Sequence, residues 1–327
     1  MKSKKTFVIY GVIAILVLLV LGWFGANYYL SYRVDAQARE IVDSMGLSEK
    51  IKWKSISASF GKTAKVQEVE LNFPEILPKP IQIKELALTN FERVRKTFEL
   101  DLVASDITDN TDKSYFYTLK DMYKELKGFH LRDIPPMNAS LHIENSYIDD
   151  LISVQIDLEQ EGGLNFDFNT NLKNINPFLE QVDKVLEPSS DEDTKKLSDA
   201  ELQILLGSQL AIVQVVNSEI YIEDSGLIKN NRNDARNYMH RVHCPNILNS
   251  LEYRRPEQLC EPFHNFLLAR EKDVNFSISP GGGFYLSKLL EYYPFDNFDN
   301  HTTGQLLRAL QFKISNTTEI FNKYINR

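Results

Sequence analysis

The feature that most constrains the fold of this chain is the repeated alternation of apolar and polar residues. Ten short segments place apolar residues at every second position, with polar residues between them. Because successive side chains of a strand point to opposite faces, each segment predicts a strand that is apolar on one face only. The segments are 69–73, 81–83, 86–88, 98–102, 141–143, 154–158, 164–168, 220–222, 274–278 and 310–314.

One-sided strands of this kind are typical of antiparallel sheets with one face on a core and the other in water, since parallel strands are buried on both faces. The turn Glu161-Gly162-Gly163, between two alternating segments, predicts the clearest hairpin of the chain. We therefore expect an α+β protein built on a mainly antiparallel, curved β-sheet with helical insertions.

Helical patterns interrupt the strands. The apolar residues of 34–45 recur at helical spacing up to Gly46, and the capping box of Ser198 and Glu201 opens another helical segment. The full set of predicted helices is 34–45, 114–127, 177–186, 198–213, 234–243, 256–271, 287–293 and 304–309.

Residues 7–26 form the only long apolar run without charges. Twenty residues span about 30 Å as a helix, which is the thickness of a bilayer core. Lysines precede this run and aromatic residues follow it, so the positive-inside rule places the N-terminus in the cytoplasm. A cleaved signal peptide is the alternative, but its apolar core is usually shorter, and Phe24-Gly25-Ala26 is a poor cleavage site.

These features give a domain plan. We expect a cytoplasmic tail over 1–6, a transmembrane helix over 7–26, a helical linker over 27–50, and an extracytoplasmic β-rich domain over 51–327 with a helical insertion at about 230–272. Residues 1–33 hold four of the 37 basic residues and none of the 45 acidic ones, which leaves the rest with a net charge of about −12. Such an acidic body is a poor general binder of nucleic acid.

Cys244 and Cys260 are the only cysteines, and an exported domain meets an oxidising compartment. We therefore predict a disulfide between them, which would contribute about 3 kcal/mol to stability. A metal site is the alternative, because His240, His243 and His264 flank the two cysteines, although the spacing is unlike that of structural zinc sites.

Catalytic motifs are missing from the sequence. It contains no nucleophile elbow, zinc-protease helix, phosphate-binding loop or dinucleotide fingerprint, and it implies no cofactor. The adjacent acids Asp149-Asp150 and Glu223-Asp224 lie at predicted turns and strand ends, where carboxylates more often cap backbone groups than act as a catalytic pair.

The order of elements resembles that of bacterial inner-membrane proteins with AsmA-like or YdgA-like periplasmic domains. Three segments carry the resemblance: a strand, a proline-rich turn and a second strand over 51–91, a strand-to-helix junction over 220–229, and a strand, turn and helix over 274–290. The resemblance implies a role in envelope maintenance and, for the AsmA and TamB branch, the transport of phospholipid along a hydrophobic β-groove.

Three functions stay open. The leading hypothesis is a non-enzymatic, single-span protein of the bacterial inner membrane that handles lipid or maintains the envelope. The second is a scaffold or assembly subunit of a secretion or pilus apparatus, and the third is an envelope-polymer hydrolase that uses paired acids such as Glu223 and Asp224. The expected partners are the membrane, through residues 7–26, and a phospholipid or another envelope protein.

Overall fold

The computed structural model describes residues 30–44, 46–59, 63–74, 77–94, 96–115, 117–118, 134–180, 208–209, 211–231, 244–288 and 300–316. Within these residues the strands form one open twelve-stranded sheet, and each strand pair in it is antiparallel. The α+β class and the antiparallel sheet predicted from the alternating segments are therefore confirmed.

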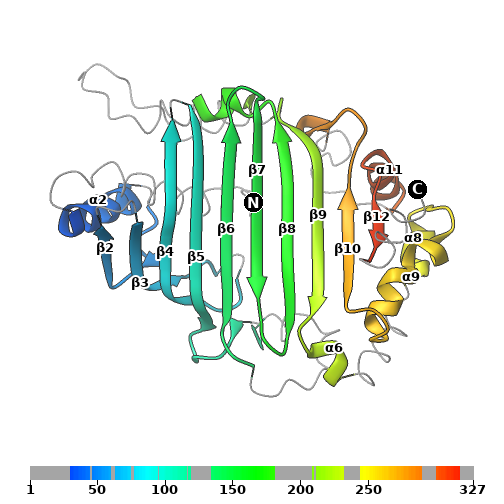
Figure 1. The fold of residues 1–327 in the computed structure, drawn as a ribbon, viewed down its shortest axis with the longest axis horizontal. Coiled ribbons are helices and arrows are strands. Elements are labelled where there is room, and N and C mark those ends of the chain that lie inside the picture. The colour runs from blue at the N-terminus through cyan, green and yellow to red at the C-terminus, as the bar shows by residue number, and fades with distance from the viewer. Residues whose placement is uncertain are drawn as a thin grey trace.

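The sheet is largely a meander, in which consecutive strands pair with each other (Figure 1). Its order is β1-β3-β4-β5-β6-β7-β8-β9-β10-β12, while β2 pairs with β3 and β11 pairs with β9. The bounds are β1 Ile51–Lys52, β2 Ser55–Ser59, β3 Thr63–Leu71, β4 Ile81–Val94, β5 Thr97–Asp109, β6 Met137–Ser146, β7 Leu151–Glu159, β8 Leu164–Lys173, β9 Gln214–Asp224, β10 Asp273–Ile278, β11 Phe284–Tyr285 and β12 Lys313–Ser315.

The predicted hairpin is present. Strands β7 and β8 pair along their length, and Gly162 in the turn between them has φ 71°, a left-handed conformation that favours glycine. The segments 81–83 and 86–88, which predict two strands, lie in the single strand β4. The polar residues between them do not interrupt the strand, because Glu85 still pairs with Gln67 of β3 and Ser105 of β5. The short strands β1, β2 and β11 were not predicted.

The predicted helix over 34–45 is confirmed as α2 (Leu30–Ser44). Its apolar side chains Val34, Ala38 and Val42 are spaced four residues apart and are buried. The helix over 256–271 is confirmed as α9 (Pro256–Leu267), and the helix over 304–309 begins earlier, as α11 (Asn300–Ala309).

Two further helices are α6 (Leu227–Asn230) and α8 (Cys244–Ser250). The strand-to-helix junction quoted over 220–229 is present as β9 followed by α6. The structure describes only the beginnings of the predicted helices over 114–127, 177–186 and 287–293 and the end of the one over 198–213. The helix predicted over 234–243 lies outside the described residues.

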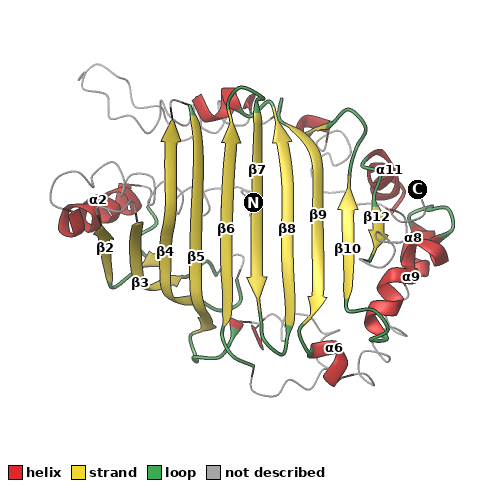
Figure 2. Ribbon diagram, in the orientation of Figure 1, coloured by secondary structure: helices red, strands yellow, loops and turns green. Residues whose placement is uncertain are grey.

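The helices α2, α8, α9 and α11 lie at the two edges of the sheet, α6 follows the end of β9, and short helical segments lie at the opposite ends of the strands (Figure 2). Helix α2 packs beside β2 and β3, where Ala38 and Val42 join an apolar cluster that includes Trp53, Val66 and Val69. Helices α8, α9 and α11 lie at the opposite edge, beside β12 (Figure 1). Another apolar cluster lies on the sheet itself and contains Leu88 and Leu100.

No described helix is long and apolar enough to cross a membrane. Residues 7–26, for which the sequence predicts the transmembrane helix, lie outside the described residues, so this span stays a prediction.

Candidate functional site

The register of the sheet defines an apolar face and a polar face. Directly paired residues share a face, and the pairing aligns Ile156 of β7, Phe168 of β8, Ile220 of β9 and Phe276 of β10 in one row. With strands about 4.8 Å apart, this row extends over about 14 Å of the sheet. We call Ile156, Phe168 and Ile220 the apolar row.

The apolar row is only partly covered. Among the residues that the structure describes, none of its three side chains belongs to a buried cluster, although the clusters on both sides include residues of the same strands. Ile156 and Phe168 are partly exposed, and Ile220 is 42% exposed. A large aliphatic side chain this exposed at a mid-sheet position, with partly exposed apolar neighbours, marks a surface able to bind apolar groups.

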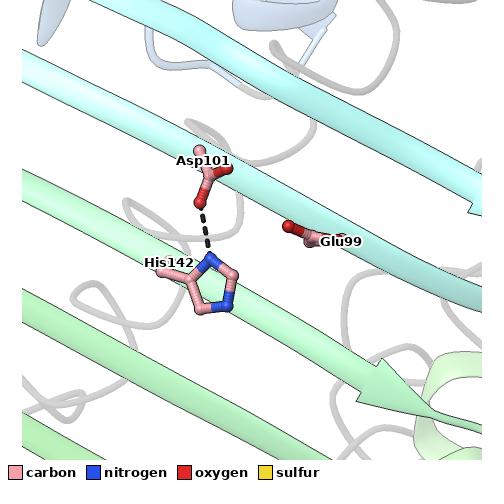
Figure 3. A group of neighbouring side chains, drawn as sticks. All are labelled: Glu99, Asp101 and His142. Carbon is pink, nitrogen blue, oxygen red and sulfur yellow. Dashed lines mark hydrogen bonds and ion pairs between the residues drawn. The ribbon is translucent and has the colours of Figure 1, made fainter.

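The opposite face is polar and rich in carboxylates. Asp101 of β5 pairs with His142 of β6, and one step along the same strands Glu99 pairs with Glu144. Figure 3 shows Asp101 and Glu99 on one strand beside the imidazole of His142 on the next. The Nδ1 atom of His142 lies 2.5 Å from Oδ1 of Asp101. We call Glu99, Asp101 and His142 the carboxylate–histidine cluster.

The ligand atoms of this cluster converge. One donor atom from each of Glu99, Asp101 and His142 lies within 4.8 Å of the other two. No other group of three carboxylate, histidine or cysteine side chains gathers this closely in the part of the chain that the structure describes. The Nδ2 group of Asn90 donates a hydrogen bond of 3.0 Å to Oε1 of Glu99, which helps to orient that carboxylate.

The electrostatics of the polar face favour positive charge. The hydrogen bond to Asp101 raises the pKa of His142, and the charges of Glu99 and Glu144 add to the effect. Two strands away, burial raises the pKa of Asp167, and the charge of Asp157 directly opposite raises it further. Carboxylates therefore repel each other across this face, and cations are attracted to it.

The structure joins the two cysteines. Cys244 and Cys260 form a disulfide with their Cα atoms 6.0 Å apart, as the sequence predicts. The bridge links α8 to α9 inside a buried apolar cluster. It occupies both sulfur atoms, so the alternative metal site loses its two thiolate ligands. His264 lies on α9, while His240 and His243 lie outside the described residues.

The paired acids have separate structural partners. Glu223 forms an ion pair with Lys272, whereas Asp224 accepts backbone hydrogen bonds of 2.8 Å from Ile228 and 2.9 Å from Lys229 at the start of α6. Asp224 is thus a capping residue rather than one member of a carboxylate dyad.

Asp149 and Asp150 likewise serve the turn between β6 and β7. Asp149 accepts a hydrogen bond of 2.6 Å from the hydroxyl of Ser146, and Asp150 accepts one of 2.9 Å from the backbone N–H of Asn176. Both carboxylates therefore have the backbone and turn roles that their positions in the sequence favour.

No protein-family model matches this chain, and no curated protein is significantly similar to it.

The carboxylate–histidine cluster is not among the sites that the sequence pattern predicts. Asp101 and His142 are 41 residues apart in the chain, and no local motif joins them. The alternation did contain a signal, because Glu99, Asp101 and His142 occupy the polar positions of segments 98–102 and 141–143. Only the pairing of β5 with β6 brings these positions together.

Proposed function

We propose that this chain is a non-enzymatic, single-span envelope protein whose exported sheet binds the acyl chains of a lipid on the apolar row. The observation that carries this proposal is the partial exposure of Ile156, Phe168 and Ile220 in the middle of a sheet face, between the buried apolar clusters that lie to either side. Covering the exposed parts of three such side chains would contribute about 3 kcal/mol, at about 1 kcal/mol each.

Lipid is the apolar ligand that the predicted topology brings closest. Only residues 27–29 separate the predicted membrane helix from α2, a distance of at most about 11 Å of extended chain. Because α2 packs on the β2–β3 edge, that edge would lie next to the membrane surface. A sheet anchored in this way meets lipid at a far higher local concentration than any other apolar molecule.

The disulfide supports the exported location. Disulfides persist in oxidising compartments such as the bacterial periplasm and are rare in the cytosol. We therefore propose an inner-membrane protein with a cytoplasmic N-terminus and a periplasmic sheet domain.

The test is site-specific photocrosslinking of the full-length protein in cells. A benzophenone amino acid at position 220 would lie on the apolar row, and the same residue at position 219 would lie on the opposite face of the same strand, as a matched control. Both wild-type residues are exposed, so the two probes differ mainly in the face they occupy. We expect a phospholipid adduct at position 220 and none at position 219, detected by mass spectrometry of the purified chain.

Two results would contradict lipid binding. Equal lipid adducts at both positions would mean that the probe reports general contact with membrane lipid. A single protein partner captured at position 220 without lipid would instead favour the scaffold function.

A further inference from the structure

We propose that the carboxylate–histidine cluster of Glu99, Asp101 and His142 is a binding site for one divalent transition-metal ion of the zinc class. The site lies on the face opposite the apolar row, and it does not depend on lipid binding. Its three donors come from two directly paired strands in the interior of the sheet, where the backbone holds them in register (Figure 3).

The distances permit coordination after small side-chain movements. The three donor atoms lie within 4.8 Å of one another, and the Nδ1 atom of His142 is 2.5 Å from Oδ1 of Asp101. Zinc binds histidine nitrogen and carboxylate oxygen at about 2.0–2.2 Å, so two ligands of one tetrahedral ion lie about 3.4 Å apart, and these two donors would separate by about 1 Å. Glutamate and aspartate side chains reach such a shift by small rotations that leave the strands in place.

The type of donor indicates the type of ion. An imidazole with two carboxylates suits zinc and its neighbours in the first transition series, whereas calcium and magnesium prefer oxygen donors alone. The side chains of His142 and Asp101 are 37% and 31% exposed, so water can reach the site and fill the remaining coordination positions.

A second observation is a pair of like charges beside the cluster. Glu99 of β5 and Glu144 of β6 are directly paired, and directly opposite like charges destabilise an antiparallel sheet. A divalent cation bound at Glu99 would reduce this repulsion.

A hydrogen bond from a third strand also orients one of the donors. Asn90 donates its hydrogen bond to Glu99 from β4 on the far side of the cluster, an arrangement that resembles the outer-shell contacts of metal ligands. Ion binding would replace the proton that His142 shares with Asp101, so the affinity should increase as the pH rises.

The test uses the full-length protein after treatment with a chelator. Zinc chloride is titrated into it, and binding is measured by isothermal titration calorimetry. We expect one site for each chain, which His142→Ala abolishes and Glu99→Gln weakens at least tenfold. The matched control is His301→Ala, since His301 also lies 2.9 Å from a carboxylate, that of Glu252, but without a second one in a cluster. This control should bind zinc as the wild type does.

Cobalt(II) gives an independent readout, because coordination by the cluster would produce visible absorption that His142→Ala removes. If His142→Ala does not fold, the nearly isosteric Glu99→Gln still tests whether the cluster binds the ion. Wild-type protein with no binding tighter than about 0.1 mM would overturn the proposal. Unchanged zinc affinity in both cluster variants would overturn it as well. The lipid adduct at position 220 is measured on the other face, so the two proposals can fail separately.

Discussion

The buried carboxylate of Asp109, at the end of β5, gives the sharpest prediction about stability. Asp109 is fully buried, and it accepts hydrogen bonds of 2.7 Å from Nζ of Lys79, 3.0 Å from the hydroxyl of Thr118, and 2.8 Å and 2.6 Å from the backbone N–H and hydroxyl of Thr111. A single carboxylate thus joins the segment before β4 to the segment after β5.

The pKa of Asp109 fixes the sign of the pH effect. Burial by itself would raise this pKa, but the hydrogen bonds from Lys79, Thr111 and Thr118 hold it well below its usual range. The folded protein therefore binds this proton more weakly than the unfolded chain. The stabilisation is complete above the unfolded pKa of about 3.9, and it is lost as the pH falls below that value toward the folded pKa.

The perturbation is Asp109→Ala. Breaking a buried ion pair by removing one partner costs about 3–5 kcal/mol. Because the side chain of Lys79 is 38% exposed and can be hydrated, we expect the low end, about 3 kcal/mol. Asp109→Asn should cost less, about 2 kcal/mol, since an amide oxygen still accepts hydrogen bonds from Thr111 while the amide N–H groups face Lys79.

The assay is urea unfolding of the full-length protein in detergent. Circular dichroism monitors the unfolding at pH 7 and at pH 3. The control is Lys84→Ala, which breaks the exposed ion pair between Lys84 and Asp106 and should have a much smaller effect. Equal losses for Asp109→Ala and Lys84→Ala at pH 7 would refute the reasoning. A difference between wild type and Asp109→Ala that stays the same from pH 7 to pH 3 would refute the assigned pKa.

Three further predictions concern the sheet and the helices. Asp167→Asn should raise the free energy of unfolding at pH 7 by about 0.5 kcal/mol, because it removes repulsion from Asp157, and the gain should vanish at pH 3 in the same urea assay. Gly304→Ala should lower the melting temperature, since its Cβ would lie 1.9 Å from the carbonyl oxygen of Leu251, at a cost of about 2 kcal/mol. Gly281→Ala, where the nearest atom would be 3.4 Å away, is the control, and an equal loss there would contradict this explanation. Replacing both cysteines with alanine should cost about 3 kcal/mol, because the bridge joins positions 16 residues apart. A reducing agent should lower the free energy of unfolding of the wild type by a similar amount. An unchanged free energy of unfolding would contradict a stabilising role of the disulfide.

The sequence alone was sufficient for the local structure of most of the sheet. Period-two alternation predicts which residues form strands and which side of each strand is apolar, because it follows from backbone geometry within one strand. The same holds for the helix α2, for the hairpin turn at Gly162, and for the disulfide, since a pair of cysteines allows only one pairing within the chain.

Functional surfaces depend on contacts between distant segments, which alternation does not encode. Ile220 has the pattern of a core residue, yet it is 42% exposed, because coverage depends on which other segments pack on its face. Asp109 lies in a polar stretch typical of a surface turn, and the structure buries it completely. The carboxylate–histidine cluster forms only when β5 and β6 pair in one particular register. A shift by one residue would turn His142 to the other face, so strand composition predicts the sheet, whereas only tertiary pairing determines the site.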